Sequence, residues 1–278
     1  MFHIIDLVKT ALSEDLGQGD ITCHCLIPDH TIGKAQIIAK EEIILGGIDI
    51  AALVFHTLDP EITIEKCFND GERISASEVI AILKGNLTDL LTGERVALNF
   101  LQHLSGIATL THRFVDAVKD YKTKILDTRK TTPGMRTLEK YAVRVGGGNN
   151  HRFGLSDGFL IKDNHIRACG GITQALQRAK SNTPFTLKIE VEVKSLEEVE
   201  EALEAGAEIV MLDNMNLDSI EAAVSLIDKR AVIEVSGGVT LENVKEIART
   251  GVDYISVGAL THSARAVDIS MELMEAVS

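Results

Sequence analysis

The sequence predicts an α/β protein in two parts: a region with a mostly antiparallel sheet, then an open, incomplete α/β barrel. Short apolar runs between residues 34 and 84, separated by turn signals and by no long helix, indicate the first part. Six apolar runs that alternate with helical segments from residue 124 onward indicate the barrel. A chain of 278 residues is long enough to build both parts.

The N-terminal part is expected to begin with a helix at residues 4–14 and to end with a long amphipathic helix at residues 87–120. Gly46-Gly47 and Asn69–Gly71 are expected to form turns. Because no helix is expected between the strands, they should pair locally and antiparallel. The strand candidates are Ala35–Ala39, Ile62–Glu65 and Val79–Leu83.

The barrel part repeats the order strand then helix, which predicts a parallel sheet that is closed or nearly closed. Its six units are two fewer than a complete eightfold barrel contains. Ser195 and Thr240 occupy N-cap positions ahead of helices at 196–205 and 241–250. The strand candidates are Lys124–Asp127, Phe159–Lys162, Leu187–Val193, Ile209–Leu212, Val232–Val235 and Tyr254–Val257.

The last segment, Ala264–Val277, is expected to be a helix with no strand after it. It should therefore leave the barrel and pack on the N-terminal domain. The predicted domains are residues 1–110 joined by the C-terminal helix 264–278, and a barrel of residues 111–263.

Charge is distributed unevenly along the chain. The whole chain has a formal net charge of −13, whereas residues 122–167 contain ten Lys/Arg against four Asp/Glu, a net charge of +6. A basic cluster in an acidic protein suits a small polyanionic substrate and argues against nucleic acid, which the rest of the surface would repel. No apolar stretch could span a bilayer, no secretory signal is visible, and the four scattered cysteines indicate reduced thiols, so we expect a cytoplasmic protein.

Polar residues follow the apolar strands, where the active site of an α/β barrel is expected. They include basic groups that suit carboxylates or pyrophosphate, and His151, which suits a dicarboxylate. Glu192 and Asp213 could accept hydrogen bonds from ribose hydroxyls, hold Mg²⁺, or pair with neighbouring cations. His103, His112 and His262 are interpreted as structural. The basic groups are Arg129, Lys130, Arg152 and Lys162.

Two glycine-containing turns follow the last two strands and precede helices. Their bare backbone N–H groups could hold a phosphate at a helix N-terminus. The expected phosphate-binding residues are Ser236, Gly237, Gly238, Gly258, Ala259 and Leu260.

These motifs resemble those of the quinolinate phosphoribosyltransferases, and the resemblance covers nearly the whole chain. The long central motif is specific, whereas the glycine turns alone would be weak evidence. The matching motifs are Glu14–Thr22, Gly93–Asn99, Leu104–Thr109, Thr128–Gly134, Gly146–Arg152, Leu160–His165, Glu190–Glu192, Leu212–Asn214, Glu234–Gly238 and Ser256–Leu260.

The resemblance implies an N-terminal α/β sandwich joined to an open α/β barrel, and a homodimer in which Arg95 completes the partner's site. It implies the conversion of quinolinate and phosphoribosyl pyrophosphate (PRPP) into nicotinate mononucleotide, CO₂ and pyrophosphate, with Lys130, Glu192 and Asp213 as catalytic residues. Mg²⁺ would act together with PRPP, and no organic cofactor is expected. The other implied substrate-binding residues are Thr128, Arg129, His151, Arg152 and Lys162.

Three alternatives remain open from the sequence. A paralogue of similar fold, such as the molybdenum-transport-associated homologue, would use another aromatic acid or have no known reaction. A Schiff-base aldolase would use Lys162 as its nucleophile. A sensor of phosphoribosyl or pyridine compounds would bind its ligand without turnover.

Overall fold

The computed structural model describes residues 2–277, so Met1 and Ser278, at the ends of the predicted N-terminal domain, lie outside the described residues. The chain forms two compact units. The first contains residues up to 110, residues 133–147 and residues from 264 onward, and the second contains residues 111–132 and 148–263. Residues 133–147, counted with the barrel in the sequence-based division, thus belong to the first unit.

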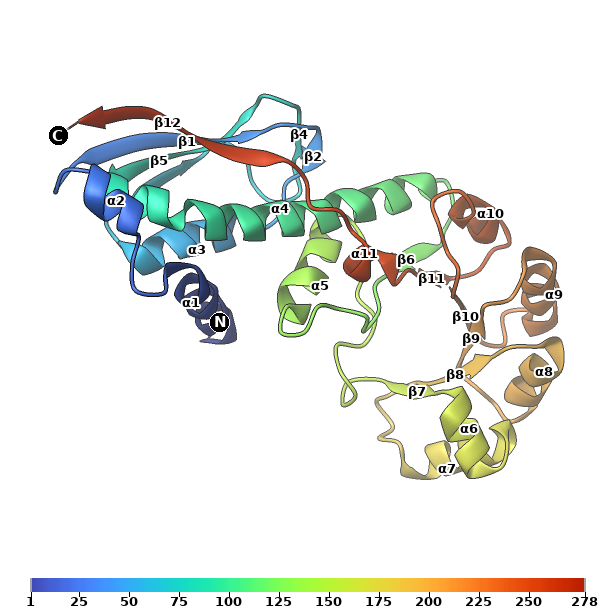
Figure 1. Cartoon of the computed structure of the whole chain (residues 1–278). Coiled ribbons are helices and arrows are strands. Elements are labelled where there is room, and N and C mark those ends of the chain that lie inside the picture. The colour runs from blue at the N-terminus through green and yellow to red at the C-terminus, as the bar shows by residue number, and fades with distance from the viewer. Residues whose placement is uncertain (1, 278) are drawn as a thin grey trace. The chain divides into compact units, whose positions relative to one another are not determined.

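The first unit contains a four-stranded antiparallel sheet in the order β12-β1-β5-β3, formed by Ile269–Val277, Ile32–Ala39, Val79–Asn86 and Thr63–Lys66. A two-stranded sheet pairs β2 (Ile43–Ile44) with β4 (Arg73–Ile74). The expected strands and their antiparallel pairing are confirmed. Figure 1 shows α3 and the long helix α4 on one face of the larger sheet. The helices are α1 (Phe2–Leu16), α2 (Ile21–Leu26), α3 (Ile48–Leu58), α4 (Leu87–Ala117), whose last residues belong to the second unit, and α5 (Arg136–Val145).

Two expectations for this unit are wrong. Helix α3 separates the strands where no long helix was expected, because most of its residues are apolar and buried and so lack an amphipathic pattern. The predicted C-terminal helix is instead strand β12, which pairs antiparallel with β1 and lies beside it in Figure 1. Its Met, Glu and Ala residues favour a helix locally, but pairing with β1 outweighs that preference. The segment does join the first unit, as expected.

The second unit contains a six-stranded parallel sheet in the order β6-β11-β10-β9-β8-β7. The two edge strands, β6 and β7, are consecutive in the chain, so the barrel is open between them, as the six-unit prediction expected. All six expected strands are present: Lys124–Leu126, Phe159–Ile161, Ile189–Val193, Ile209–Asp213, Val232–Ser236 and Tyr254–Ser256.

Helices follow the strands of this unit: α6 (Asp163–Cys169), α7 (Ile172–Asn182), α8 (Leu196–Glu204), α9 (Leu217–Ile227), α10 (Val244–Arg249) and α11 (Ala259–His262). Ser195 caps α8 as predicted, since its side chain accepts a hydrogen bond from the Glu198 N–H. Thr240 is not a cap. Helix α10 begins at Val244 after Asn243, whose side chain instead accepts a hydrogen bond from the Thr240 N–H. Within residues 2–277, no helix is both long and apolar enough to cross a membrane.

Candidate active site

A pocket of about 500 Å³ opens among residues at the carboxyl ends of the barrel strands. We call it the carboxyl-end pocket. It brings together nine of the predicted site residues: Thr128, Arg129, Lys130, His151, Arg152, Lys162, Glu192, Asp213 and Ser236. They are far apart in sequence and meet because parallel strands end at the same edge of a barrel. Leu160, Met211, Asn214, Glu234 and Ser256 complete the lining.

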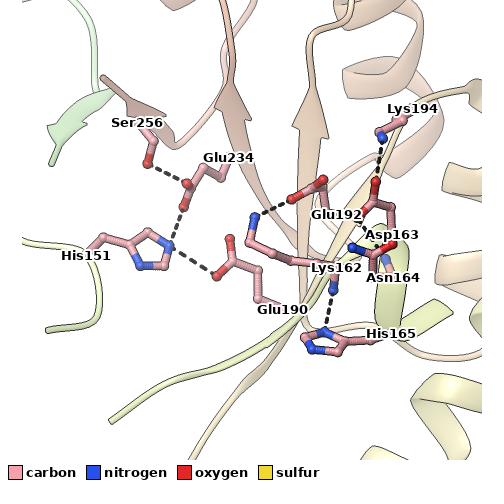
Figure 2. A network of polar contacts seen from close by, with 10 residues as sticks. All are labelled: His151, Lys162, Asp163, Asn164, His165, Glu190, Glu192, Lys194, Glu234 and Ser256. Carbon is pink, nitrogen blue, oxygen red and sulfur yellow. Dashed lines mark hydrogen bonds and ion pairs between the residues drawn. The ribbon is translucent and has the colours of Figure 1, made fainter. Parts of the chain in front are cut away.

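Lys162 and Glu192 form an ion pair inside this pocket. The Lys162 Nζ lies 2.6 Å from Glu192 Oε2, and Figure 2 shows the two side chains pointing toward each other from neighbouring strand ends. Glu192 is buried, whereas almost half of the Lys162 side chain is exposed. The main chain of Lys162 is fixed locally, because its N–H donates to Nδ1 of His165 in the first turn of α6. The expected pairing of Glu192 with a neighbouring cation is therefore confirmed.

The segment after β6 is held by hydrogen bonds to the main chain of Lys130. Thr128 Oγ1 accepts from the Lys130 N–H at 3.0 Å, and the Thr261 hydroxyl donates to the Lys130 carbonyl at 2.8 Å. Arg152 donates from Nη1 to the Gly158 carbonyl at 3.0 Å. Burial, reinforced by the charge of Arg129, lowers the pKa of Arg152 from its ordinary value. These neighbouring guanidinium groups make the pocket attractive to an anion.

Asp127 positions the segment that carries His151. Its fully buried carboxylate accepts a hydrogen bond from the Asn150 side-chain amide at 2.5 Å and another from the His151 N–H at 2.9 Å. Asp127 ends the predicted strand Lys124–Asp127, and the sequence alone did not indicate its contact with residues 150 and 151. The contact fixes a loop of the chain against the end of β6.

His151 contacts two buried carboxylates in the barrel interior (Figure 2). Its Nε2 lies 3.2 Å from Glu190 Oε2 and 3.5 Å from Glu234 Oε2, and the Ser256 hydroxyl donates to Glu234 Oε1 at 2.5 Å. Burial alone would lower the pKa of His151, but hydrogen bonds to Glu190 and Glu234 raise it to about 10. Burial raises the pKa of Glu190, and the nearby Glu234 adds to that rise.

The same three side chains could hold a divalent cation. Among the described residues, His151, Glu190 and Glu234 are the one group of three potential metal ligands, and their ligand atoms lie within 4.8 Å of one another. Glu192 and Asp213, the predicted Mg²⁺ pair, both line the carboxyl-end pocket and offer the oxygen atoms that Mg²⁺ prefers.

One of the two glycine turns, the one with Gly237 and Gly238, differs from expectation. Gly237 and Gly238 have left-handed φ angles of 90° and 64°, and neither N–H has a hydrogen-bond acceptor in the described part of the chain. They do not adjoin a helix N-terminus, because α10 begins only at Val244. Gly258 directly precedes the short helix α11, in which Leu260 is buried. Of the six expected phosphate-binding residues, Ser236 lines the carboxyl-end pocket.

Arg95 is not among the residues that line this pocket. It lies on α4 in the first unit. His103, interpreted as structural, is 2.9 Å from the buried Glu139.

Glu190 and Glu234 were not assigned a role from the sequence, although the pattern carries a signal for each. In Ile189–Val193 two glutamates alternate with apolar residues, which places both on one face of β8. Glu234 interrupts an otherwise apolar strand. A charged residue within such a strand is costly unless it has a partner.

Comparisons with known protein families and proteins point to the same family for both parts of the chain. Residues 20–105 match the family described as quinolinate phosphoribosyl transferase, N-terminal domain, and residues 107–272 match the corresponding C-terminal domain. A probable nicotinate-nucleotide pyrophosphorylase [carboxylating] of Synechocystis is 48% identical over 95% of this chain and 90% of its own. A mitochondrial quinolinate phosphoribosyltransferase [decarboxylating] of Nicotiana tabacum is 42% identical over 98% of this chain and 82% of its own.

A solved structure, the nicotinate-nucleotide pyrophosphorylase from Francisella tularensis, superposes with a TM-score of 0.94 at 46% identity. The match covers 98% of this chain and 96% of that one. Both domains are thus matched in sequence and the fold is matched as a whole. The chain belongs to the quinolinate phosphoribosyltransferase family.

Proposed function

We propose that the carboxyl-end pocket is the active site in which this quinolinate phosphoribosyltransferase joins quinolinate to PRPP. The products are nicotinate mononucleotide, CO₂ and pyrophosphate, as in de novo NAD synthesis. The observation that carries the proposal is the gathering of four basic side chains and two carboxylates, Glu192 and Asp213, in one pocket. The basic side chains are Arg129, Lys130, Arg152 and Lys162.

The basic groups match the substrates in charge. Quinolinate carries two adjacent carboxylates, and guanidinium groups bind carboxylates through paired hydrogen bonds. Arg129 and Arg152 are therefore assigned to quinolinate, and Lys130 to the reacting groups. Displacement at the anomeric carbon of ribose develops positive charge on the sugar, which Glu192 and Asp213 can stabilise. The unpaired N–H groups of Gly237 and Gly238 suit the phosphate of PRPP.

Mg²⁺ would be held by Glu192 and Asp213 together with the oxygens of PRPP. When bound, the ion would neutralise negative charge on the departing pyrophosphate. When no other cation is present, the ion pair with Lys162 balances the negative charge of the Glu192 carboxylate.

Two further properties belong to the proposal. We expect a homodimer in which Arg95 reaches the partner's site. We also expect a cytoplasmic enzyme, in keeping with four free cysteines.

The aldolase alternative is disfavoured by the Lys162–Glu192 pair. An ammonium group that donates to a carboxylate at 2.6 Å has no free electron pair with which to attack a carbonyl. Borohydride reduction in the presence of small aldehydes and ketones, the substrates that a Schiff-base aldolase requires, should therefore trap no adduct on Lys162.

The proposal is tested by incubating the protein with quinolinate, PRPP and Mg²⁺. Nicotinate mononucleotide, CO₂ and pyrophosphate should appear in equal amounts. Nicotinate, which lacks the second carboxylate, is the matched control and should be a much poorer substrate. Binding of both substrates without pyrophosphate release would support the sensor alternative instead.

A further inference from the structure

Arg152 lies where three cavities of the barrel unit meet. It lines the carboxyl-end pocket, a cavity of about 470 Å³ at the first residues of the strands, and a third cavity of about 430 Å³ beside α6 and α7. A guanidinium group on a long side chain can turn toward any of the three. Its direction must therefore be fixed before it can bind a carboxylate in the carboxyl-end pocket.

The loop of residues 153–158, which we call the arginine cradle, holds the Arg152 side chain. At the end of the cradle, the Gly158 carbonyl accepts a hydrogen bond from Arg152 Nη1 at 3.0 Å. Gly158 directly precedes β7, and β7 pairs with β8. The acceptor is thus anchored to the sheet of the barrel rather than to a free loop.

Gly158 also leaves no room for a side chain of its own. A Cβ at this position would lie 2.8 Å from the Cβ of Arg152 and 3.1 Å from its Cδ. Changing the rotamer of Arg152 would not relieve the first contact, because the main chain fixes the position of a Cβ atom. The φ angle of Gly158 is not left-handed. Glycine is therefore needed here for the close approach of Arg152 and not for the backbone conformation.

Asp157 fastens the other end of the cradle. Its carboxylate accepts hydrogen bonds from the N–H of Phe153 and, at 2.7 Å, from the N–H of Gly154. These contacts close the loop onto the residue that directly follows Arg152. The negative charge of Asp157 also attracts the Arg152 guanidinium.

We propose that Gly158 and Asp157 are positioning residues that aim the Arg152 guanidinium at quinolinate in the carboxyl-end pocket. The inference rests on the proposed function, in which Arg152 binds a quinolinate carboxylate. Neither positioning residue lines that pocket. Because PRPP is assigned to other groups of the pocket, the cradle should act on quinolinate and hardly on PRPP.

The test measures the Kd of quinolinate by calorimetry and the KM of PRPP at saturating quinolinate. In Gly158→Ala the added methyl group displaces Arg152, so quinolinate should bind about tenfold or more weakly, as for loss of a charge-assisted contact. The KM of PRPP should change little. The matched control is Gly154→Ala in the same loop, where a Cβ would meet only Asp157 Oδ1 at an ordinary 3.4 Å. It should match the wild-type protein in both measurements.

A double-mutant cycle shows whether Gly158 acts through Arg152, since the effects of coupled residues do not add. In an Arg152→Ala background, the contact between the two Cβ atoms remains, but no guanidinium is left to misplace. Gly158→Ala should then cause no further loss of quinolinate affinity. A disturbance of the fold alone would still appear in this background.

Asp157→Asn tests the second positioning residue without adding any atom to the cradle. An amide cannot accept both N–H groups through two oxygens, so the loop should loosen and quinolinate should bind more weakly. This loss should also vanish in the Arg152→Ala background. The variant replaces Gly158→Ala if the latter does not fold, as judged by its unfolding temperature.

Normal quinolinate affinity in folded Gly158→Ala would overturn the inference, and so would an equal weakening of both substrates or additive losses in the cycle. A rise in the KM of PRPP alone would overturn it too, because Arg152 would then serve the other substrate. All these outcomes leave the proposed function standing. No nicotinate mononucleotide from the wild-type protein would overturn the proposed function, and the inference with it.

Discussion

Lys162 Nζ lies 2.6 Å from the buried carboxylate of Glu192, across the carboxyl ends of the neighbouring strands β7 and β8. The pair joins a cation predicted to bind substrate to a carboxylate predicted to face ribose and metal. Both charges are thus positioned before any ligand arrives. When a ligand binds, Lys162 and Glu192 would each exchange their contact with the other for a contact with the ligand. No new charged side chain would have to enter the pocket.

Lys162→Met should destabilise the protein, because it leaves the buried Glu192 without its cation. Breaking a buried pair costs about 3–5 kcal/mol, but Lys162 is almost half exposed, so we expect a loss of roughly 1–2 kcal/mol after solvent screening. Urea unfolding measures the loss. Lys194→Met is the control, because the pair of Lys194 with Asp163 is open to solvent and its loss should destabilise the protein much less. Equal losses in the two variants would contradict this account.

Lys130→Ala should abolish most turnover and leave the fold intact. The Lys130 main chain is held by Thr128 and Thr261 through contacts that do not involve its side chain. Losing one partner of a charge-assisted contact costs roughly 2–5 kcal/mol, more than tenfold in binding. Steady-state kinetics and circular dichroism measure the two effects. Lys122→Ala, an exposed lysine of the same basic stretch, should behave as wild type. Near-normal kinetics for Lys130→Ala would remove this residue from the site.

Gly237→Ala should weaken PRPP binding more than Gly238→Ala does. Both positions have a positive φ, so both variants carry the same kind of backbone strain. A Cβ at Gly237, however, would lie 2.3 Å from Oδ1 of Asn214, which lines the pocket, whereas nothing lies within 4 Å of a Cβ at Gly238. Calorimetry with PRPP and with quinolinate separates the effects. Equal loss of both affinities in Gly237→Ala would point to a general disturbance of the turn.

Arg95→Ala and Lys130→Ala should each be inactive alone and should recover activity when mixed. If Arg95 acts in the partner's site, one site of each mixed dimer keeps both wild-type residues. Random pairing makes about half of the dimers mixed, so the ceiling is roughly a quarter of wild-type activity for a symmetric dimer with independent sites. The measurement is turnover after dissociation and reassociation, with mixed dimers identified by mass. No recovery would mean that Arg95 acts within its own subunit.

Cys23 should react with iodoacetamide more slowly than Cys25 and Cys67. Burial, with a contribution from the neighbouring Asp20, raises the pKa of the Cys23 thiol to about 11. Since the thiolate is the reactive form, little of it is present below that pH. Cys25 and Cys67 are exposed. Peptide mapping of the alkylated protein at pH 8 checks the order, and labelling of Cys23 first would contradict the assigned environment.

The sequence predicted the elements that local patterns specify. The six barrel strands are short apolar runs with helical segments between them, and helix α4 follows a clear amphipathic period. The polar residues after each strand were predicted to converge, and nine predicted site residues do line one pocket. This was possible because parallel strands of a barrel share one edge, so position along each strand is enough to predict proximity.

Other features depended on contacts between distant parts of the chain. Residues 269–277 favour a helix by composition and become a strand only because β1 offers its edge for pairing. The roles of Glu190 and Glu234 depend on His151, which lies on a loop fixed by Asp127. The sequence by itself determined which residues end the strands and the charge they carry. Only the tertiary structure decided which of those charges are buried and paired, because burial and pairing arise when segments distant in the chain meet.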